Sequence, residues 1–569
     1  MKRALVVGVV AASALALPAA AWAHAALLKT FPPASAEVDT PPAELRLVYD
    51  EAVEPRFAVV SVTDAAAHQQ IDGPLHPSAS NPYELDAPLT RSAEGWYLVF
   101  WRVISADGHP ARGAFLYRVG PNPGPPPQFV IPSLSETAVT PGLVALRWLT
   151  FLSAMAAVGL FVLRTAIARP VVARVSGTSL RAVSLTFGAS VAVGLVVTPI
   201  YVLLATARFA LRSFWSFGAL VPLMDVSAFG RAYLRFELLL ALFAVAAAAA
   251  IWLDRPHRAQ RSVAGLLSLW GALLAAGALL LVPGAAGHAA QTSPRALALA
   301  FDWLHLAAGT LWIGGLVGLL VLWSSLPAVR RTAGLVVCVP RFSNAALVSV
   351  VVLLGSGIGA AVLHLPTLAT LWQTGYGKTI VVKASLLFAA ILLAAVNLLR
   401  TKPGLARNET SAGAAVLLRR LVAGEVVLVA AAIVAAAVLS SYPPPPKTLA
   451  SIGAPAATAG PGPVTEVVQR NGYRVDVRVS PNKVAVPDEY TVRLTRNGAP
   501  VRGATVVATF TMLDMEMPTQ AYRLAERAPG VYEHTSEALV MVGRWGLTFQ
   551  VQPAGAQPFD VVVVDHAAG

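Results

Sequence analysis

The sequence predicts three folded parts in one chain: an Ig-like β-sandwich, a bundle of eight transmembrane helices, and a second β-sandwich. Three observations lead to this multidomain fold class. The 569 residues exceed the usual length of a single domain. Hydrophobic residues make up 56% of the chain and charged residues only 13%, against roughly 25% charge in soluble domains. Long apolar runs fill residues 141–440, whereas alternating apolar and polar patterns fill the regions on both sides.

The N-terminus predicts export. Lys2 and Arg3 precede an apolar stretch at 4–17, and Ala21-Trp22-Ala23 forms an A-x-A cleavage site. We therefore expect residues 1–23 to be a secretory signal peptide. Its removal makes His24 the first residue of the mature chain.

Residues 24–120 predict a sandwich of about seven short strands. The segments "AELRLVYD" and "FAVVSVTD" alternate, and the segments "GWYLVFWRVI" and "GAFLYRVG" are rich in aromatic and β-branched residues. Gly and Pro separate these runs. The Pro-rich residues 121–140 follow as a stiff linker.

Residues 141–440 hold eight apolar segments, each long enough to span a bilayer at about 20 residues. The segments lie at 143–167, 182–206, 232–253, 263–283, 297–323, 343–363, 379–399 and 416–439.

The basic residues between these segments predict the orientation of the bundle. The odd-numbered loops carry clusters such as Arg255, Arg258 and Arg261, whereas the even-numbered loops carry few basic residues. Because positively charged loops remain in the cytoplasm, both ends of the bundle are expected on the outer side. The signal peptide independently places the N-terminal sandwich on that side.

A second Pro-rich linker at 441–465 leads into residues 466–569. The segments "YRVDVRVS", "YTVRLTRNG", "ATVVATFTML" and "WGLTFQVQP" alternate as strands do. They predict the second exported β-sandwich.

A candidate metal site lies in the first sandwich. A chain that begins with His24 offers an amine and an imidazole from one residue. Asp107 and His109, in "SADGHP", are two residues apart, so on an extended strand they share a face. A set of three nitrogens and one carboxylate oxygen favours Cu(II). The alternative is that Asp107 and His109 are structural or face solvent.

The segments "HAALLKTFPPASAEVDTPPAELRLVYDEAVEPRF" and "GWYLVFWRVISADGHPARGAFLYRVG" resemble the periplasmic copper-resistance protein family CopC over nearly all of 24–120. The resemblance implies a cupredoxin-like β-sandwich with a Cu(II) site made by His24, Asp107 and His109. Some members also carry a Met-rich Cu(I) site. Residues 24–120 contain no methionine, so we do not expect that second site here.

Polar residues recur within the apolar segments. Asp302, His305 and Trp312 have spacings that keep them on one helix face, and His288 and His364 flank the segments at their outer ends. Ionisable groups inside a membrane are costly and commonly line an interior path. The alternative for His305 is a buried histidine that only satisfies hydrogen bonds.

Two stretches, "GHAAQTSPRALALAFDWLHLAAGTLWIGGL" (287–316) and "YGKTIVVKASLLFAAILLAAVNLLR" (376–400), resemble the CopD family of inner-membrane copper proteins. The second stretch contains Lys383 and Asn397. The resemblance implies copper passage across the bacterial cytoplasmic (inner) membrane. The loop charges and the signal peptide place both terminal domains in the periplasm. The expected transport path comprises His288, Asp302, His305 and His364.

The segment "TMLDMEMP" provides a candidate Cu(I) site at Met512, Met515 and Met517, because thioethers are soft ligands. The alternative is that these methionines pack the core of the sandwich. The region resembles the YtkA-like domains that follow some CopC–CopD fusions.

These features favour copper binding, transport and homeostasis, with copper ions, the lipid bilayer and periplasmic copper chaperones as partners. The alternative is an exported copper-binding, redox or sensing protein without transport. The single cysteine, Cys338, argues against disulfides and thiolate metal sites. No nucleic-acid partner is expected, because the basic residues act as topology signals. The segment "GYGKT" lacks the first glycine of a phosphate loop, so we do not expect it to bind ATP. We also expect no enzyme activity, whether haem redox chemistry or copper monooxygenase activity.

Overall fold

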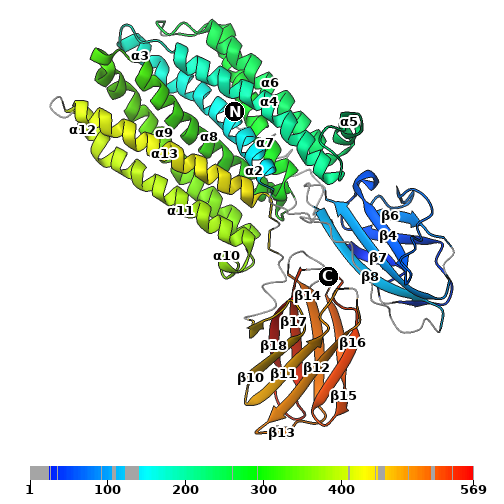
Figure 1. The fold of residues 1–569 in the computed structure, drawn as a ribbon. Helices are drawn as coiled ribbons and strands as arrows, with labels where there is room; N and C mark the ends of the chain where they lie inside the picture. Colours follow the sequence, from blue (N-terminus) through cyan, green and yellow to red (C-terminus); the bar gives the residue numbers. More distant parts are fainter. Residues whose placement is uncertain are drawn as a thin grey trace, which may run out of the picture. The chain divides into compact units, whose positions relative to one another are not determined.

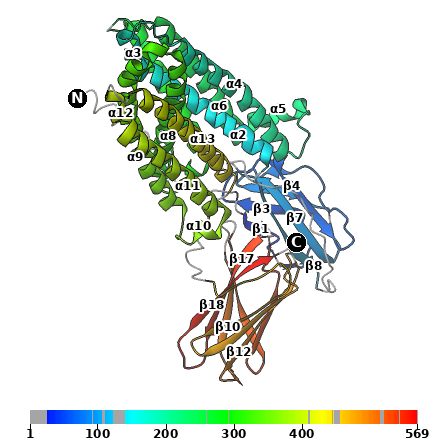
Figure 2. The same ribbon diagram turned by 60° about the vertical axis from the view of Figure 1, so that its left-hand side comes forward.

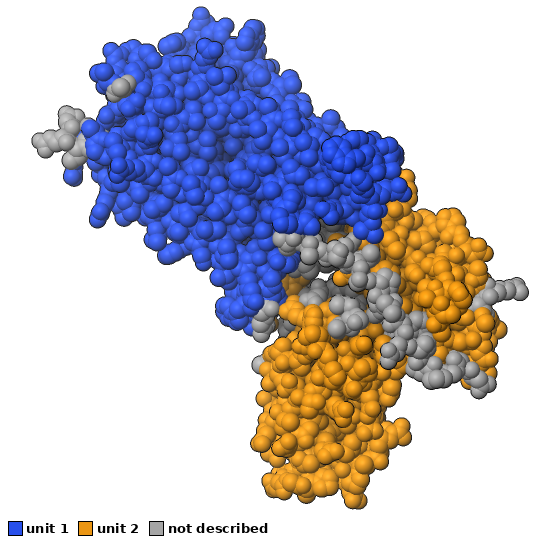
Figure 3. Space-filling view, viewed as in Figure 1, with its two compact units in different colours: residues 1–20, 138–365, 369–442 blue, residues 21–137, 366–368, 443–569 orange. Residues whose placement is uncertain are grey.

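The computed structural model describes most of the chain, in two compact units (Figure 3). One unit contains residues 138–365 and 369–442, and the other contains 21–137, 366–368 and 443–569. The described residues are 25, 27–34, 36–90, 93–105, 110–121, 140–258, 260–290, 292–407, 411–442, 444–445, 455–484, 486–513, 519–540 and 543–567.

The N-terminal region is a β-sandwich, as the sequence predicts. Its described strands form two four-stranded sheets, in the orders β1-β3-β6-β5 and β2-β8-β7-β4 (Figure 1). The strands are β1 (Leu27–Phe31), β2 (Glu37–Val38), β3 (Glu44–Tyr49), β4 (Val59–Asp64), β5 (His76–Pro77), β6 (Glu84–Pro88), β7 (Gly95–Ile104) and β8 (Pro110–Val119).

Strands β7 and β8 form the centre of this sandwich. They pair along their whole length, from Gly95 with Val119 to Ile104 with Pro110. Every residue of β7 after Gly95 is buried, which explains the nearly continuous apolar sequence of this strand. The rings of Tyr49 and Trp101 meet edge to face at 5.7 Å between the two sheets.

The helical unit contains eight described helices long and apolar enough to cross a membrane, and they match the eight predicted segments. Two of them continue through a π-helical turn into a short helix. The helices are α2 (Pro141–Val162), continued by Leu163–Ala168 and α3 (Arg169–Arg174); α4 (Arg181–Phe209); α5 (Phe217–Val226); α6 (Ala228–Leu253); α7 (Val263–Ala286); α8 (Arg295–Ser325); α9 (Arg331–His364); α10 (Thr370–Gln373); α11 (Gly375–Val396), continued by Asn397–Thr401 and α12 (Lys402–Ala406); and α13 (Ser411–Leu439).

Helices α2 and α8 are the most buried of the eight and cross at two glycines. A Cβ atom on Gly159 would lie 2.7 Å from the Cα of Gly314, so neither position tolerates a side chain without a shift of backbone. Small residues at such a crossing let two membrane helices approach closely, and dispersion contacts then hold them together.

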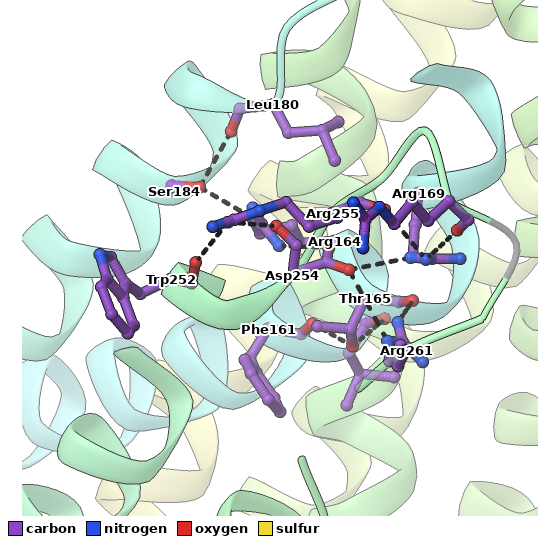
Figure 4. A network of polar contacts seen from close by, with 12 residues as sticks. Phe161, Arg164, Thr165, Arg169, Leu180, Ser184, Trp252, Asp254, Arg255 and Arg261 are labelled. Carbon is purple, nitrogen blue, oxygen red and sulfur yellow. Dashed lines mark hydrogen bonds and ion pairs between the residues drawn. The ribbon is translucent and has the colours of Figure 1, made fainter. Parts of the chain in front are cut away.

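A buried charge network lies where α2 and α6 end and α7 is about to begin (Figure 4). The side chain of Asp254, just after α6, is 2% exposed and lies among three guanidinium groups. Arg164 Nη1 is 3.3 Å, Arg169 Nε 3.0 Å and Arg261 Nε 3.8 Å from its carboxylate oxygens. Arg261 also donates to the carbonyl of Thr165 at 2.6 Å, within the π-helical turn that follows α2. The network therefore ties the end of α2 to the connection between α6 and α7.

The C-terminal region is also built of strands, as predicted (Figure 1, Figure 2). The described strands follow the order β10-β11-β12-β16-β15-β14-β17-β18-β9, with β13 paired to β12. The strands are β9 (Ala457–Thr458), β10 (Val464–Arg470), β11 (Tyr473–Ser480), β12 (Asp488–Arg496), β13 (Ala499–Pro500), β14 (Thr505–Met512), β15 (Gln520–Ala528), β16 (Val531–Ser536), β17 (Gly543–Gln552) and β18 (Phe559–Ala567).

Alternation in sequence accounts for the core of this domain. In β11, Tyr473, Val475, Val477 and Val479 are buried while the residues between them are exposed or half-buried. Across the core, the rings of Tyr490 in β12 and Phe510 in β14 lie 4.7 Å apart. The two halves of the sheet therefore pack face to face, and β15 pairs with a strand of each half.

Candidate functional site

Two predicted path histidines meet at one end of the helical unit. His288 lies in a short 3₁₀ turn between α7 and α8, and His364 is the last residue of α9. Thr292 joins them: its hydroxyl donates to the His288 carbonyl at 2.8 Å and lies 3.1 Å from His364 Nε2. His364 Nδ1 lies 2.7 Å from the carbonyl of Ala360 and donates to it. The other ring nitrogen of His364, Nε2, therefore faces Thr292.

Asp302 lies two helical turns into α8, in a space that a glycine provides. A Cβ atom on Gly284 of α7 would collide with the Asp302 carboxylate. Asp302 interacts electrostatically with Lys383 and with Tyr376, both on α11. The Tyr376 ring also lies 6.4 Å from the ring of His364, measured between centroids. Tyr376 therefore connects the histidine pair to Asp302.

His305, one turn further along α8, is held by α9 and α11. Its Nδ1 lies 3.1 Å from the carbonyl of Leu353 and 3.3 Å from Ser356 Oγ, so Nδ1 carries a proton and donates it. Its Nε2 lies 3.2 Å from Lys383 Nζ. The Nε2 lone pair therefore accepts from an ammonium group. This lone pair is the one that a metal ion would use.

A third polar group lies toward the opposite end. The Asn397 amide donates to the carboxylate of Glu425 on α13, and Trp312 of α8 interacts with the same carboxylate. Glu425 is 2% exposed and Trp312 is 1% exposed. Both side chains are therefore inside the bundle and away from its lipid-facing surface.

Spacing on α11 explains why these groups line up. Tyr376, Lys383 and Asn397 are separated by 7 and 14 residues, which keeps them on nearly one face of a helix. At 1.5 Å per residue, the distance from Tyr376 to Asn397 is about 32 Å, close to the thickness of a hydrocarbon core. We call this set of polar residues on α8, α9, α11 and α13, together with His288 just before α8, the polar path. Its members are His288, Asp302, His305, Trp312, His364, Tyr376, Lys383, Asn397 and Glu425.

The polar path offers imidazole and carboxylate donors in succession. Imidazole nitrogen is a good ligand for copper, and carboxylate oxygen can complete its shell. Among the described residues, no three His, Cys, Asp or Glu side chains converge on one point that could hold a metal ion. Within the described part of the path, each position therefore supplies few donors.

The predicted Cu(II) ligands His24, Asp107 and His109 lie outside the described residues. Their described neighbours are Ala25, which is fully buried in the sandwich core, and the paired strand ends Ile104 and Pro110. The segment that contains Asp107 and His109 thus connects β7 to β8.

Only one residue of the candidate Cu(I) site is described. Met512, the last residue of β14, is 3% exposed and belongs to the hydrophobic core. It pairs with Trp545 of β17. This position agrees with the core-packing alternative for Met512. Met515 and Met517 lie outside the described residues.

The four histidine and aspartate residues predicted for the path thus lie in two linked pairs. Sequence reasoning did not identify Thr292 and Ser356, and it assigned no role to Tyr376 or to Lys383 next to His305. The seven-residue spacing of polar residues in α11 was the available signal for Tyr376 and Lys383. Thr292 and Ser356 carried no such signal, because hydroxyl residues are common at helix ends and within membrane helices.

Comparisons with known proteins agree with this architecture. Three family models match in order: the CopC domain over residues 27–120, Copper resistance protein D over 336–439, and a YtkA-like domain over 468–550. The Copper transport protein CutJ of Bacillus subtilis (strain 168) is 24% identical over 546 residues, which cover 93% of each chain. Protein YobA of Escherichia coli (strain K12) is 32% identical over 99 residues, covering 17% of this chain and 80% of YobA.

Among solved structures, CopC from Methylosinus trichosporium OB3b is similar at 29% sequence identity with a TM-score of 0.17. The match covers 17% of this chain and 96% of that chain. PcoC, a methionine-rich copper resistance protein from Escherichia coli, is similar at 24% identity with a TM-score of 0.16, covering 17% and 99%.

The eight apolar helices and the two flanking β-domains define a multi-pass membrane protein. The three family matches in this order confirm the resemblance expected from the sequence. The chain belongs to the CopC–CopD fusion proteins that carry a C-terminal YtkA-like domain. It therefore combines domains of copper-resistance proteins in a single polypeptide.

Proposed function

We propose that this protein binds copper and carries it inward across the bacterial cytoplasmic membrane, in copper uptake and homeostasis. The observation that supports this proposal is the polar path on α8, α9, α11 and α13, which holds an imidazole, a carboxylate and an ammonium inside the helical bundle. Such groups are costly within a membrane and need a functional reason to be there.

In this proposal the N-terminal sandwich captures the cargo. After removal of the signal peptide, the amine and imidazole of His24 bind Cu(II) together with Asp107 and His109. Both terminal domains lie on the periplasmic side, because the arginine-rich loops remain in the cytoplasm. Periplasmic copper chaperones then deliver copper to the same domain.

The ion next enters the bundle at the His288–His364 pair and passes to Asp302 and His305. At that point it meets the Lys383 ammonium, which occupies the His305 Nε2 lone pair. A cation can bind this nitrogen only after Lys383 moves away. Since Lys383 also interacts with Asp302, its ammonium can turn toward that carboxylate as the ion arrives.

Transport is tested by copper uptake into proteoliposomes and by the copper content of cells that express each variant. We expect His305→Ala to reduce both quantities strongly. The matched control is His257→Ala, which removes an exposed histidine from the loop between α6 and α7. Uptake by His305→Ala equal to that of His257→Ala, at equal amounts of folded protein, would contradict transport along this path.

The capture site is tested on the full chain by Cu(II) titration with EPR, after mass spectrometry has identified the mature N-terminus. We expect a type 2 signal with nitrogen splitting that weakens in His109→Ala and Asp107→Ala. His76→Ala, which changes an exposed histidine of the same domain, serves as the control. A spectrum unchanged by Asp107→Ala and His109→Ala would refute the assignment.

The alternative function is copper binding or sensing without transport. The contact between Lys383 and His305 gives it a specific basis, since an ammonium that stays on Nε2 closes the path. In that case the EPR titration succeeds, and no variant of the polar path alters uptake into proteoliposomes.

A further inference from the structure

The C-terminal sandwich buries two carboxylates in its interior. Asp488 is the first residue of β12 and Asp565 lies near the end of β18, and both residues are 0% exposed. They belong to strands in different halves of the folded sheet. The charge of Asp565 raises the pKa of Asp488, which places the two carboxylates within electrostatic range of one another.

Asn482, also 0% exposed, connects the two carboxylates. Its backbone N–H donates to Asp488 Oδ1 at 2.6 Å, and its Nδ2 donates to Asp565 Oδ1 at 2.9 Å. Nδ2 also donates to the carbonyl of Gly462 at 2.8 Å. Because Nδ2 donates to two acceptors, the orientation of the amide is fixed, and Oδ1 is its remaining acceptor atom.

Three buried acceptor oxygens in this cluster have no hydrogen-bond partner among the residues that the structure describes. They are Asn482 Oδ1, Asp488 Oδ2 and Asp565 Oδ2. The Tyr490 hydroxyl lies beside Asp488 and interacts with its carboxylate. Buried polar atoms in folded proteins are nearly always satisfied, so a group of unpartnered acceptors requires a ligand, water or a proton.

The charges of the cluster are also unbalanced. Burial, with a smaller contribution from the charge of the nearby Asp565, raises the pKa of Asp488 to about 7. Burial raises the pKa of Asp565 as well. Without a ligand, the pair would therefore retain a proton. One proton, however, neutralises only one of the two carboxylates and can be shared by only two carboxylate oxygens. It leaves Asn482 Oδ1 without a donor. A bound cation, by contrast, neutralises both carboxylates and takes acceptor oxygens as its ligands.

We propose that Asp488, Asp565 and Asn482 form a binding site for Ca²⁺ in the C-terminal domain. The donors are carboxylate and amide oxygens, which are the ligands of a hard cation, and no nitrogen or sulfur atom is among the three. Ca²⁺ accepts six to eight such oxygens in irregular geometry, with water in the remaining positions. The site therefore differs in chemistry from any copper site of the chain.

This site lies beside the segment that carries the candidate Cu(I) ligands. Met512, Trp545 and Asp565 occupy facing positions on the adjacent strands β14, β17 and β18. The segment with Met515 and Met517 begins just after Met512. Ca²⁺ at Asp565 would thus stabilise the strand ends from which that segment departs.

The test uses the full chain in detergent, freed of divalent cations with EGTA. Equilibrium dialysis with ⁴⁵Ca²⁺ measures binding, and hydrogen exchange of peptides from β12 and β18 locates it. The variants are Asp488→Asn and Asp565→Asn, with Asp560→Asn as a control, since Asp560 is exposed on the same strand as Asp565. Circular dichroism in EGTA verifies that each variant is folded.

We expect the wild type and Asp560→Asn to bind one more Ca²⁺ per chain than Asp488→Asn or Asp565→Asn. Addition of 1 mM CaCl₂ should slow exchange in β12 and β18 at least tenfold in the first two proteins only. If one of the two site variants does not fold, the other makes the same test. Equal binding by all four proteins, or no slowing of exchange in the wild type, would overturn the proposal and assign the pair to a shared proton.

Discussion

Replacing Asp254 by asparagine tests whether the charge network at the end of the bundle holds α2 to the connection between α6 and α7. Asparagine keeps the size of the side chain and removes its charge. Three guanidinium groups then remain close together without an anion: Arg164, Arg169 and Arg261, whose side chains are 8%, 14% and 21% exposed. Their mutual repulsion is poorly screened because the network is largely shielded from water.

The expected loss of stability follows from this burial. Removing one partner of a buried ion pair typically costs about 3–5 kcal/mol, because the remaining charge is left uncompensated. Part of the network survives, since Arg261 still donates to the Thr165 carbonyl and Arg164 to Ser184. We therefore expect a value near the lower limit, about 3 kcal/mol. At roughly 2 °C per kcal/mol for a unit of this size, the unfolding midpoint of the bundle falls by about 6 °C.

The assay is thermal unfolding of the purified full chain in detergent, followed by circular dichroism of the helices. Asp225→Asn is the control, because Asp225 is an exposed carboxylate near the end of α5. The double variant Asp254→Asn with Arg169→Gln should recover part of the loss, since it removes one uncompensated charge. The expected difference between the unfolding midpoints of Asp254→Asn and Asp225→Asn is about 6 °C. A difference of about 1 °C or less would refute the structural role of the network.

Three further predictions concern the crossing of α2 and α8, the C-terminal domain and the polar path. Gly314→Val should prevent accumulation of folded protein, because the new Cβ would lie 2.6 Å from the carbonyl carbon of Gly159. The control Gly355→Val, at a position with open space, should still give folded protein. Size-exclusion chromatography distinguishes the two variants. In EGTA, the C-terminal domain should lose stability as the pH rises from 4 to 7, because the pKa of Asp488 is raised from 3.8 to about 7 and the folded state holds the extra proton across that interval. The upper limit of this loss is about 4 kcal/mol, and hydrogen exchange of β12 measures it. A loss of stability as the pH falls toward 4 would contradict the raised pKa of Asp488 in the folded state. Lys383→Met should strengthen copper binding to the bundle by roughly tenfold, because it removes a positive charge that repels a copper ion at His305 Nε2. Lys383→Arg keeps a positive charge there and should not strengthen binding, and copper titration of chains that also carry His109→Ala measures both effects.

Much of the architecture could be predicted because it depends on local pattern. The eight membrane helices follow from apolar runs that are too long for any other structure in lipid. Strand β11 begins and ends at the residues that the alternating segment predicts, Tyr473 and Ser480. Each of these predictions requires only neighbouring residues, so a single sequence was enough.

The contacts that define the candidate sites could not be predicted in the same way. His305 and Lys383 are 78 residues apart in sequence, and Asn482 and Asp565 are 83 residues apart. Periodicity places each residue on a face of its own helix or strand, but it does not state which faces meet. The π-helical turns were also missed, because a single extra residue in a helix leaves no distinct composition.

The two buried charge groups of the helical unit differ in a way that bears on function. Around Asp254, the three arginines share one carboxylate and also donate to backbone carbonyls and to Ser184, so the groups are held from several sides. Exchange of partners in that network would break several hydrogen bonds at once. At His305, by contrast, the Nε2 lone pair contacts the end of a flexible lysine side chain, Lys383 Nζ. A second partner is available to Lys383, because it also interacts electrostatically with Asp302. A path for ions needs groups that change partners, whereas a structural anchor needs groups that do not. This physical difference supports a structural role for the Asp254 network and the proposed movement of the cation along the polar path.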